Sequence, residues 1–303
     1  MKIEELKEKY KDDELLSSLL NINNDYTNEE KDIIEQVEEQ EIKEKFEKDV
    51  ESNNSITLTS ENSRFTGAKW FSDVSKLHIY LFGVGGIGSW TSLLINRLSV
   101  FSINIYDFDT VEEANMSGQL YGANSIGMNK VDAMAELLSN LGIQSTFVKG
   151  VNTECCSFGL ESDVFISGLD NMSARKKYFN IFKEHIKYLK TTETYSDKEC
   201  LFIDGRLSPN VLQIFAFSNK NEDAIKEYEE KYLFDSSEAV HEACSFKQTS
   251  YMAAMIGSLI TNIVVNWTFN KSHAIPLVTV PFLTSYNSEY MEFNIFNNFN
   301  EIK

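Results

Sequence analysis

Short apolar runs alternate with helical patterns through the middle of the chain. Each run consists mostly of aliphatic and aromatic residues and stops at a turn signal, which is typical of a buried strand. Between the runs, apolar residues recur at the three- and four-residue spacing of helices. Strands are predicted over 77–82, 101–106, 145–149 and 164–167, and helices over 89–98 and 130–141. This alternation predicts a doubly wound α/β sheet, mostly parallel and Rossmann-like, with ligands at the carboxyl ends of its strands.

The second half of the chain is less regular. Runs over 201–204 and 211–217 predict further strands, and two runs around 287–288 predict a terminal hairpin, so an antiparallel extension of the sheet is expected. Residues 223–232 predict a charged surface helix. The longest apolar stretch, over 251–267, is interrupted by polar residues and predicts a buried helix rather than a membrane span.

Residues 1–52 differ in composition from the rest of the chain. They carry 8 lysines and 18 acidic residues, a net charge of −10, and contain no Gly or Pro, so their local preference is helical. The segment predicts an N-terminal helical appendage on the main domain. A pair of partner-docking helices and a partly disordered acidic arm are the alternatives. With the polar linker after it, the appendage forms a first unit over 1–60, and a larger folded unit follows over 61–303.

The whole chain is acidic, with 28 basic and 46 acidic side chains and a formal net charge of −18. This charge argues against nucleic acid and anionic membranes as partners, because both attract clustered Lys and Arg. None of the 4 cysteines forms a C-x-x-C pair, so no zinc is expected. The low cysteine content and the absence of an apolar stretch near Met1 predict a cytoplasmic protein without a secretory signal.

The most informative motif is the run LFGVGGIGSW, in which Gly83, Gly85 and Gly88 form G-x-G-x-x-G directly after a predicted strand. The glycines permit a tight turn, a close approach of backbone N–H groups to a phosphate, and close packing of helix against strand. Asp107 ends the next strand, 19 residues after Gly88, where a carboxylate accepts hydrogen bonds from ribose hydroxyls. Together they predict an adenine nucleotide site. The alternative is a glycine turn without a ligand.

Four motifs, in this order, resemble those of the ThiF/MoeB/E1 family, ATP-dependent enzymes that adenylate the C-terminus of ubiquitin-like proteins. They are GVGGIGS, with Gly86 as the family's extra glycine, YDFDTVEEAN over 106–115, SIGMNKVDA over 125–133, and GLDNMSARKKYFN over 168–180. The resemblance covers roughly residues 64–270. It implies a ThiF/E1-type fold, ATP and Mg²⁺ as cofactors, and a homodimer.

The resemblance also implies roles for individual residues. Asp107 is expected to hold the ribose, and Asn115 and Lys130 to contact the triphosphate. Asp170 is expected to bind Mg²⁺, and Arg175 to support the loop that carries Asp170. The other nucleotide-binding candidates are Gly83, Gly85, Gly86, Gly88, Asp109, Gln119 and Asn171.

Some of these residues also have ordinary structural interpretations. Asp109 would cap the following turn, Lys130 would lie on a helix surface, and Asp170 would be the N-cap of a helix that begins near residue 172. Cys244 lies in a run that resembles the family's cysteine-bearing crossover, which makes it a candidate acyl acceptor, with His241 positioned to lower its pKa. The alternative for Cys244 is a partly buried structural cysteine.

Two positions depart from the family pattern. Gly67 and Gly118 stand where the family has arginines that contact phosphate, while the first arginine of the opening motif is retained as Arg64. The candidates to replace the missing charges are Arg64, Arg97 and Arg206. The departures leave open a shifted reaction, a different nucleotide or a loss of catalysis. The opening run RFTGAKWF, over 64–71, and the two glycines also resemble ThiF-like proteins carried by bacteriophages, for which the location would be the host cytoplasm.

These observations predict an ATP-dependent adenylyltransferase that activates the C-terminal carboxylate of a ubiquitin-like or small carrier protein or peptide and releases pyrophosphate. Its candidate catalytic residues are Asp170, Lys130, Asn115, Arg64 and Cys244. One alternative is a catalytically weakened, nucleotide-binding interaction protein. A second is an NAD(P)-dependent oxidoreductase, which would use the same glycine loop but gives no role to Lys130 or Asp170.

Overall fold

The computed structural model of this chain describes residues 62–65, 67–143, 146–151, 161–234, 249–272 and 278–298. The chain divides into two units, Met1–Thr57 and Leu58–Lys303. All of the described residues belong to the second unit. The predicted acidic appendage over 1–60 therefore lies outside the described residues.

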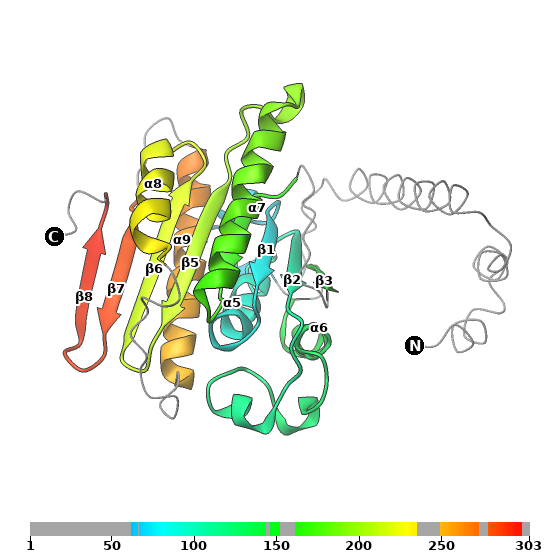
Figure 1. Cartoon of the computed structure of the whole chain (residues 1–303). Coiled ribbons are helices and arrows are strands. Elements are labelled where there is room, and N and C mark those ends of the chain that lie inside the picture. Colours follow the sequence, from blue (N-terminus) through cyan, green and yellow to red (C-terminus); the bar gives the residue numbers. More distant parts are fainter. Residues whose placement is uncertain are drawn as a thin grey trace, which may run out of the picture. The chain divides into compact units, whose positions relative to one another are not determined.

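The described strands form one eight-stranded sheet in the order β3-β2-β1-β4-β5-β6-β7-β8 (Figure 1). Neighbours from β3 to β5 pair in parallel, while β6, β7 and β8 pair antiparallel. The predicted doubly wound sheet with its antiparallel extension is confirmed. The strands are β1 (His78–Phe82), β2 (Ser102–Tyr106), β3 (Phe147–Val151), β4 (Val164–Ser167), β5 (Leu201–Leu207), β6 (Val211–Ser218), β7 (Leu283–Asn287) and β8 (Glu292–Phe296).

Helices cover both faces of this sheet (Figure 1). A mostly aliphatic core lies under α5 (Gly86–Asn96), α6 (Lys130–Leu141) and α9 (Ser250–Lys271). A mostly aromatic core lies under α7 (Met172–Lys190) and α8 (Glu222–Glu227), the latter continued by a π-helical turn, Tyr228–Tyr232. The shorter elements are α4 (Phe71–Val74) and 3₁₀ turns at Ser63–Phe65, Glu113–Ser117, Ala123–Ser125 and Glu193–Tyr195.

α9 is the long apolar helix predicted from the sequence. Within the described part of the chain, it is the one helix long and apolar enough to cross a membrane by length and composition, and half of its most apolar window is buried. Its buried side chains, such as Ile256 and Ile260, belong to the aliphatic core. At Gly257, α9 approaches α5 so closely that a Cβ would lie 3.1 Å from Thr91 N. α9 therefore packs as a core helix of the sheet.

The helix predicted over 89–98 is observed as α5 over Gly86–Asn96, and the strand predicted over 201–204 extends to Leu207. Two further differences have a clear physical reason. β3 begins two residues later than predicted, because its register is set by pairing with β2, from Ser102 opposite Phe147 to Tyr106 opposite Val151. The predicted surface helix over 223–232 is only partly at the surface. Tyr228 within it is completely buried among aromatic rings, so this segment contributes to the core.

β1 lies between β2 and β4, and the helices that follow β1 and β4, α5 and α7, cover opposite faces of the sheet. The loops that follow such neighbouring strands diverge and leave a crevice at their carboxyl ends. Here the first residues of the loops after β1 and β4 lie close together, because Gly168 N donates a hydrogen bond to Phe82 O at 2.8 Å. This switch point is where the fold places a ligand site.

His185 gives the fold a sensitivity to acid. Its side chain is buried on α7 with its ring 5.1 Å from that of Phe165, and burial, followed by the charge of Lys198, lowers its pKa from 6.5 to about 4. Because the unfolded chain binds this proton more readily, the stabilisation present above pH 6.5 is lost as the pH falls toward 4.

We therefore expect His185→Leu to reduce the loss of stability between about pH 7 and about pH 4.5 by about 2 kcal/mol. The measurement is the free energy of unfolding in urea at both pH values. Tyr188→Leu, an exposed change in the same helix, is the control and should leave the pH dependence as it is. An unchanged pH slope in the His185 variant would contradict the assignment.

Candidate functional site

The turn between β1 and α5 closes only with glycine. Gly83 has a φ of +81°, which favours glycine, and a Cβ at Gly88 would lie 1.9 Å from Gly83 O. From the loop after β4, Gly168 packs against the same turn, where its Cβ would lie 3.2 Å from Gly83 O and from Gly88 N. The three glycines bring the two loops of the switch point into direct contact.

Asp107 ties this glycine loop to the turn after β2. One carboxylate oxygen accepts a hydrogen bond from Val84 N at 2.8 Å, and the other accepts one from Asp109 N at 2.9 Å. Burial raises the pKa of Asp107 above its ordinary value, an effect that these N–H groups and Lys130 partly offset. Each oxygen keeps a second lone pair. The carboxylate can therefore still accept hydrogen bonds from a ligand's hydroxyl groups.

Lys130 is not the ordinary surface lysine of the alternative interpretation. Its side chain is buried at the start of α6, and its Nζ lies 2.8 Å from Asp109 Oδ2. Its backbone N also donates to Asp109 O at 2.9 Å. Asp109 thus orients Lys130 instead of only capping a turn. The contacts from Val84 through Asp107 and Asp109 place the Lys130 ammonium next to the glycine loop.

The segment 118–121 lies across the start of α5. Trp90 Nε1 donates to Gly118 O at 3.2 Å, Leu120 N donates to Ser89 Oγ at 3.1 Å, and the Tyr121 hydroxyl donates to Val84 O at 2.7 Å. Gln119 lies above the glycine loop, since a Cβ at Gly85 would be 3.9 Å from its Nε2. Gln119 Oε1 is buried and has no hydrogen-bond partner in the structure. A ligand donor at the loop would satisfy it.

Asn115 is part of the turn that precedes this segment. Its side-chain oxygen accepts a hydrogen bond from Glu112 N at 2.9 Å, within a capping box at the start of Glu113–Ser117. This contact uses the amide oxygen and leaves the Nδ2 group as the donor for a ligand. A contact of Asn115 with a triphosphate stays a prediction.

Asp170 follows β4 and is exposed next to the glycine loop. The N-cap of α7 is Asn171, whose Oδ1 accepts from Ala174 N at 2.8 Å. The alternative of Asp170 as this N-cap is therefore wrong, because Asn171 is the residue with extended backbone at the helix start. Asp170 Oδ1 accepts one bond, from Asn171 Nδ2 at 3.2 Å. Its carboxylate has capacity left for a cation.

No cluster of three or more metal-ligating side chains occurs within the described ranges. A lone carboxylate fits Mg²⁺ better than most metals, because Mg²⁺ is often held by one or two carboxylates together with substrate phosphates. Asp170 is such a lone carboxylate, in the loop that packs against the glycine loop. The donor set therefore suits a magnesium ion that arrives with a nucleotide.

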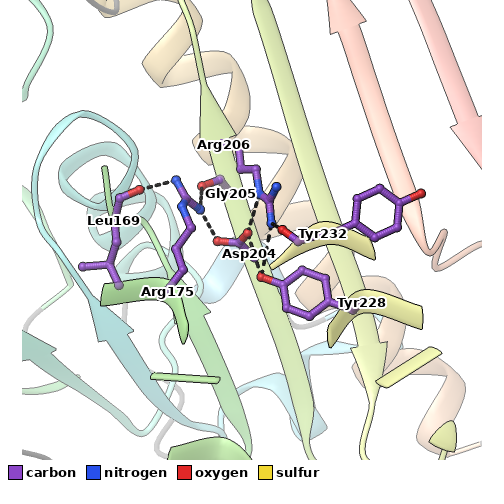
Figure 2. Close-up of polar contacts among 7 residues, drawn as sticks. All are labelled: Leu169, Arg175, Asp204, Gly205, Arg206, Tyr228 and Tyr232. Atoms are coloured by element: carbon purple, nitrogen blue, oxygen red, sulfur yellow. Dashed lines mark hydrogen bonds and ion pairs between the residues drawn. The ribbon is translucent and has the colours of Figure 1, made fainter. Parts of the chain in front are cut away.

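Figure 2 shows a buried polar cluster around Asp204, a residue that no motif of the sequence pointed to. Asp204 lies in the middle of β5, the strand next to β4, and opposite Ser167 at the carboxyl end of β4. It is completely buried and bonds to Arg175, Arg206 and the Tyr228 hydroxyl. Burial would raise the pKa of Asp204, but the two guanidiniums outweigh burial and lower it. The signal in the sequence was a charged pair inside an apolar strand, LFIDGRL.

All four arginines of the chain lie within the described residues. Arg175 and Arg206 are committed to Asp204. Arg97 is exposed at the C-cap of α5, about 16 Å from the glycine loop along the helix axis. Arg64 is exposed in the segment that leads to the amino end of β1, whereas the glycine loop follows the carboxyl end. Within one chain, Arg97 and Arg64 are therefore not brought to the loop, and Arg206 is already paired.

Two residues proposed from the sequence, Cys244 and His241, lie outside the described residues, as do Cys155 and Cys156. The remaining cysteine, Cys200, is completely buried at the start of β5, and burial raises the pKa of its thiol to about 12. A thiol with this pKa is not a nucleophile at neutral pH.

Comparison with known proteins identifies the family. The model of the ThiF family matches residues 59–301. Ubiquitin-like modifier-activating enzyme 5 of Oryza sativa subsp. japonica is 32% identical over an alignment of 114 residues, and the match covers 32% of this chain and 27% of that protein. The protein of the same name from Arabidopsis thaliana is 27% identical over an alignment of 122 residues, and the match covers 34% of this chain and 28% of that protein. The matches thus span little more than a quarter of these relatives.

Solved structures share the fold. The crystal structure of PaaA has a TM-score of 0.55 and 14% identity, covering 79% of this chain and 74% of that one. The structure of E. coli MccB with ATP has a TM-score of 0.53 and 15% identity, covering 79% and 72%. At this identity, the likeness establishes the arrangement of the sheet and helices, which confirms the expected ThiF/E1-type fold.

The contact between Gly88 and Gly83 O can be tested with a matched pair of variants. We expect Gly88→Ala to destabilise the protein by about 1–3 kcal/mol or more, because the new methyl group would overlap a backbone carbonyl. Gly122→Ala is the control, since a Cβ there meets nothing within 4 Å. Its free energy of unfolding in urea should change by less than about 0.5 kcal/mol. Equal stability of the two variants would refute the close contact.

Proposed function

The chain belongs to the ThiF family, and from this premise we propose that it is an ATP-dependent adenylyltransferase acting on a C-terminal carboxylate. One arrangement supports the proposal: hydrogen bonds link the glycine loop through Asp107 and Asp109 to the Lys130 ammonium, and Asp170 follows Gly168 and Leu169 in the neighbouring loop of the switch point, which packs against Gly83. A dehydrogenase would need only the loop and Asp107. The combination of an ammonium and a free carboxylate suits a triphosphate and its metal ion.

The proposed substrate is the terminal carboxylate of a ubiquitin-like protein, a small carrier or a peptide. Relatives named as activating enzymes of a ubiquitin-like modifier support the protein substrate. Fold neighbours include E. coli MccB in structures with ATP and with MccA, and the proposal therefore extends beyond ubiquitin-like proteins to a small carrier or a peptide. In either case the reacting group is a carboxylate at the end of an extended chain.

In the proposed reaction, a carboxylate oxygen of the substrate attacks the α-phosphorus of ATP. The new O–P bond forms while the bond between the α-phosphorus and the bridging oxygen breaks, and its electron pair leaves with pyrophosphate. No proton has to move in this step, so the chain contributes mainly position and charge. Backbone N–H groups at the start of α5 face the phosphates. The Lys130 ammonium, oriented by Asp109, offsets charge that grows on the leaving group.

Asp170 would hold Mg²⁺ together with the phosphates. The ion would neutralise phosphate charge and make the α-phosphorus more electrophilic. Gln119, whose buried side-chain oxygen lacks a partner in the structure, would accept a hydrogen bond from the nucleotide. Arg64 would reach a nucleotide only in a neighbouring copy, which is consistent with the homodimer that we propose.

A second candidate function is a nucleotide-binding interaction protein with weak catalysis. The positions of the four arginines favour it, because two are paired with Asp204 and two lie away from the glycine loop. A charge-assisted hydrogen bond to phosphate contributes about 1.5–3 kcal/mol, so the loss of two would slow adenylation by a few orders of magnitude. Measuring pyrophosphate release separates this candidate from the first.

We expect Lys130→Met to lower the rate of ATP–pyrophosphate exchange by about 10²–10³-fold, the usual cost of removing one donor that stabilises transition-state charge. Asp170→Asn should lower the rate as well and should weaken its dependence on Mg²⁺. The assay contains ATP, Mg²⁺ and candidate ubiquitin-like tails. Asp223→Asn, an exposed change on α8, is the control. Undiminished exchange in the Lys130 and Asp170 variants would refute the site.

Cys244 separates adenylation from a later acyl transfer. We expect Cys244→Ala to leave pyrophosphate exchange within about twofold of the unaltered protein and to abolish any thioester, because the thiol would act only after the adenylate has formed. Thioester formation is read as a thiol-sensitive conjugate by mass spectrometry. Cys200→Ala is the matched control, since its buried thiol cannot react. Loss of the exchange reaction in the Cys244 variant would make this cysteine structural.

A further inference from the structure

Asp204 lies in register with Phe82, the strand residue directly before the glycine loop. Phe82, the last residue of β1, pairs with Ser167, and Ser167 pairs with Asp204. Neighbouring strands are about 4.8 Å apart, so Asp204 is about 10 Å from the end of β1. It is nevertheless completely buried. It therefore cannot touch a nucleotide itself, and any influence on the site must pass through its partners.

Arg175 is the partner that reaches the site. One terminal nitrogen donates to Asp204 Oδ1 and to Gly205 O, and the other donates to Leu169 O, the carbonyl directly before Asp170 (Figure 2). On the other side of Asp170, Asn171 caps α7 and its carbonyl accepts from Arg175 N at 3.2 Å. Arg175 thus contacts the backbone on both sides of Asp170. Asp204 in turn fixes the guanidinium that makes the first of these contacts.

The opposite side of Asp204 is anchored in the aromatic core. Arg206 Nε donates to Asp204 Oδ2 at 2.8 Å, and the Tyr228 hydroxyl donates to the same oxygen at 2.9 Å. Arg206 also donates to Tyr232 O at 2.7 Å, and its guanidinium lies 4.7 Å from the ring centre of Phe215. These contacts hold the carboxylate from three directions. The Asp204 carboxylate is consequently held in one orientation relative to Arg175.

We propose that Asp204 is a positioning residue, which through Arg175 fixes the backbone around Asp170 and so sets the geometry in which Asp170 meets a magnesium nucleotide. The part of this inference that concerns the nucleotide rests on the proposed function. The part that concerns the backbone does not, because it can be measured without any ligand. The experiment below reads the two parts separately.

The test compares Asp204→Asn with Asp163→Asn. Asp163 is the matched control, because its carboxylate also pairs with a basic side chain, Lys198 at 3.3 Å, but lies directly before the amino end of β4, whereas Asp170 follows the carboxyl end. In the full chain without ligand, hydrogen exchange of the amides over 168–175 should be at least about tenfold faster in the Asp204 variant than in the control. Exchange that is unchanged, or equally faster in both variants, overturns the inference.

The second reading is the Mg²⁺ dependence of ATP binding, followed by calorimetric titration. Half-saturation should need about 10–100-fold more Mg²⁺ in Asp204→Asn and should be unaltered in Asp163→Asn, because groups that orient a metal ligand have effects of this size. An unchanged Mg²⁺ dependence overturns the role at the nucleotide. If the unaltered chain binds no ATP, the proposed function fails, and the exchange measurement alone decides whether Asp204 positions the loop.

Where Asp204→Asn does not fold, Tyr228→Phe takes its place. This change removes one of the donors to Asp204 Oδ2 and keeps the aromatic ring in the core. It should give the same pattern at smaller amplitude, with about two- to fivefold faster exchange over 168–175. A Tyr228→Phe variant with ordinary exchange over these residues overturns the inference.

Discussion

The whole site depends on a turn in which a carbonyl oxygen, Gly83 O, occupies the space of a side chain. A Cβ at Gly88 would lie 1.9 Å from this oxygen, so α5 can begin directly above β1 only when that side chain is absent. Because this connection is short, Val84 N lies 2.8 Å from the Asp107 carboxylate. The short connection also allows Gly168, in the loop after β4, to pack against Gly83 and Gly88. A longer connection would separate these groups, and the N–H groups at the start of α5 would no longer face the end of β1.

Much of the fold could be predicted because its elements follow from local patterns. Apolar runs bounded by turn residues gave β1, β2 and β4, and helical spacing gave α6 with its observed bounds, Lys130–Leu141. The start of β3 could not be predicted, because it depends on the register with β2, a partner distant in the sequence. The π-helical turn was missed for a similar reason. Its Tyr228 is buried by rings from several other elements, although its sequence neighbours are charged.

The candidate site could be predicted where motifs fix the backbone and not where side chains choose among partners. The glycine loop and Asp107 are coupled by spacing, so their contact follows from the motif. The choice of Asn171 over Asp170 as N-cap depends on which residue has extended backbone, and adjacent Asx residues cannot be distinguished by type. Arg206 was a candidate for phosphate, but β5 aligns it with Asp204 and Tyr232. The residue type of Arg206 does not show which of these partners it binds, and only the three-dimensional structure shows that it pairs with Asp204.

The charge around the glycine loop limits what can bind there. Three formal negative charges lie there, on Asp107, Asp109 and Asp170, against one positive charge on Lys130. Arg175 and Arg206 add little, because both pair with the Asp204 carboxylate, which neutralises part of their charge. A free nucleoside triphosphate would meet net repulsion from these groups, and the helix N-terminus would offset only about half an elementary charge. A nucleotide that arrives with Mg²⁺ brings its own compensation. In the proposed reaction, the metal ion thus supplies positive charge that arginines would otherwise supply. Because Gly67 and Gly118 replace those arginines, holding the metal ion through Asp170 becomes more important for binding the triphosphate.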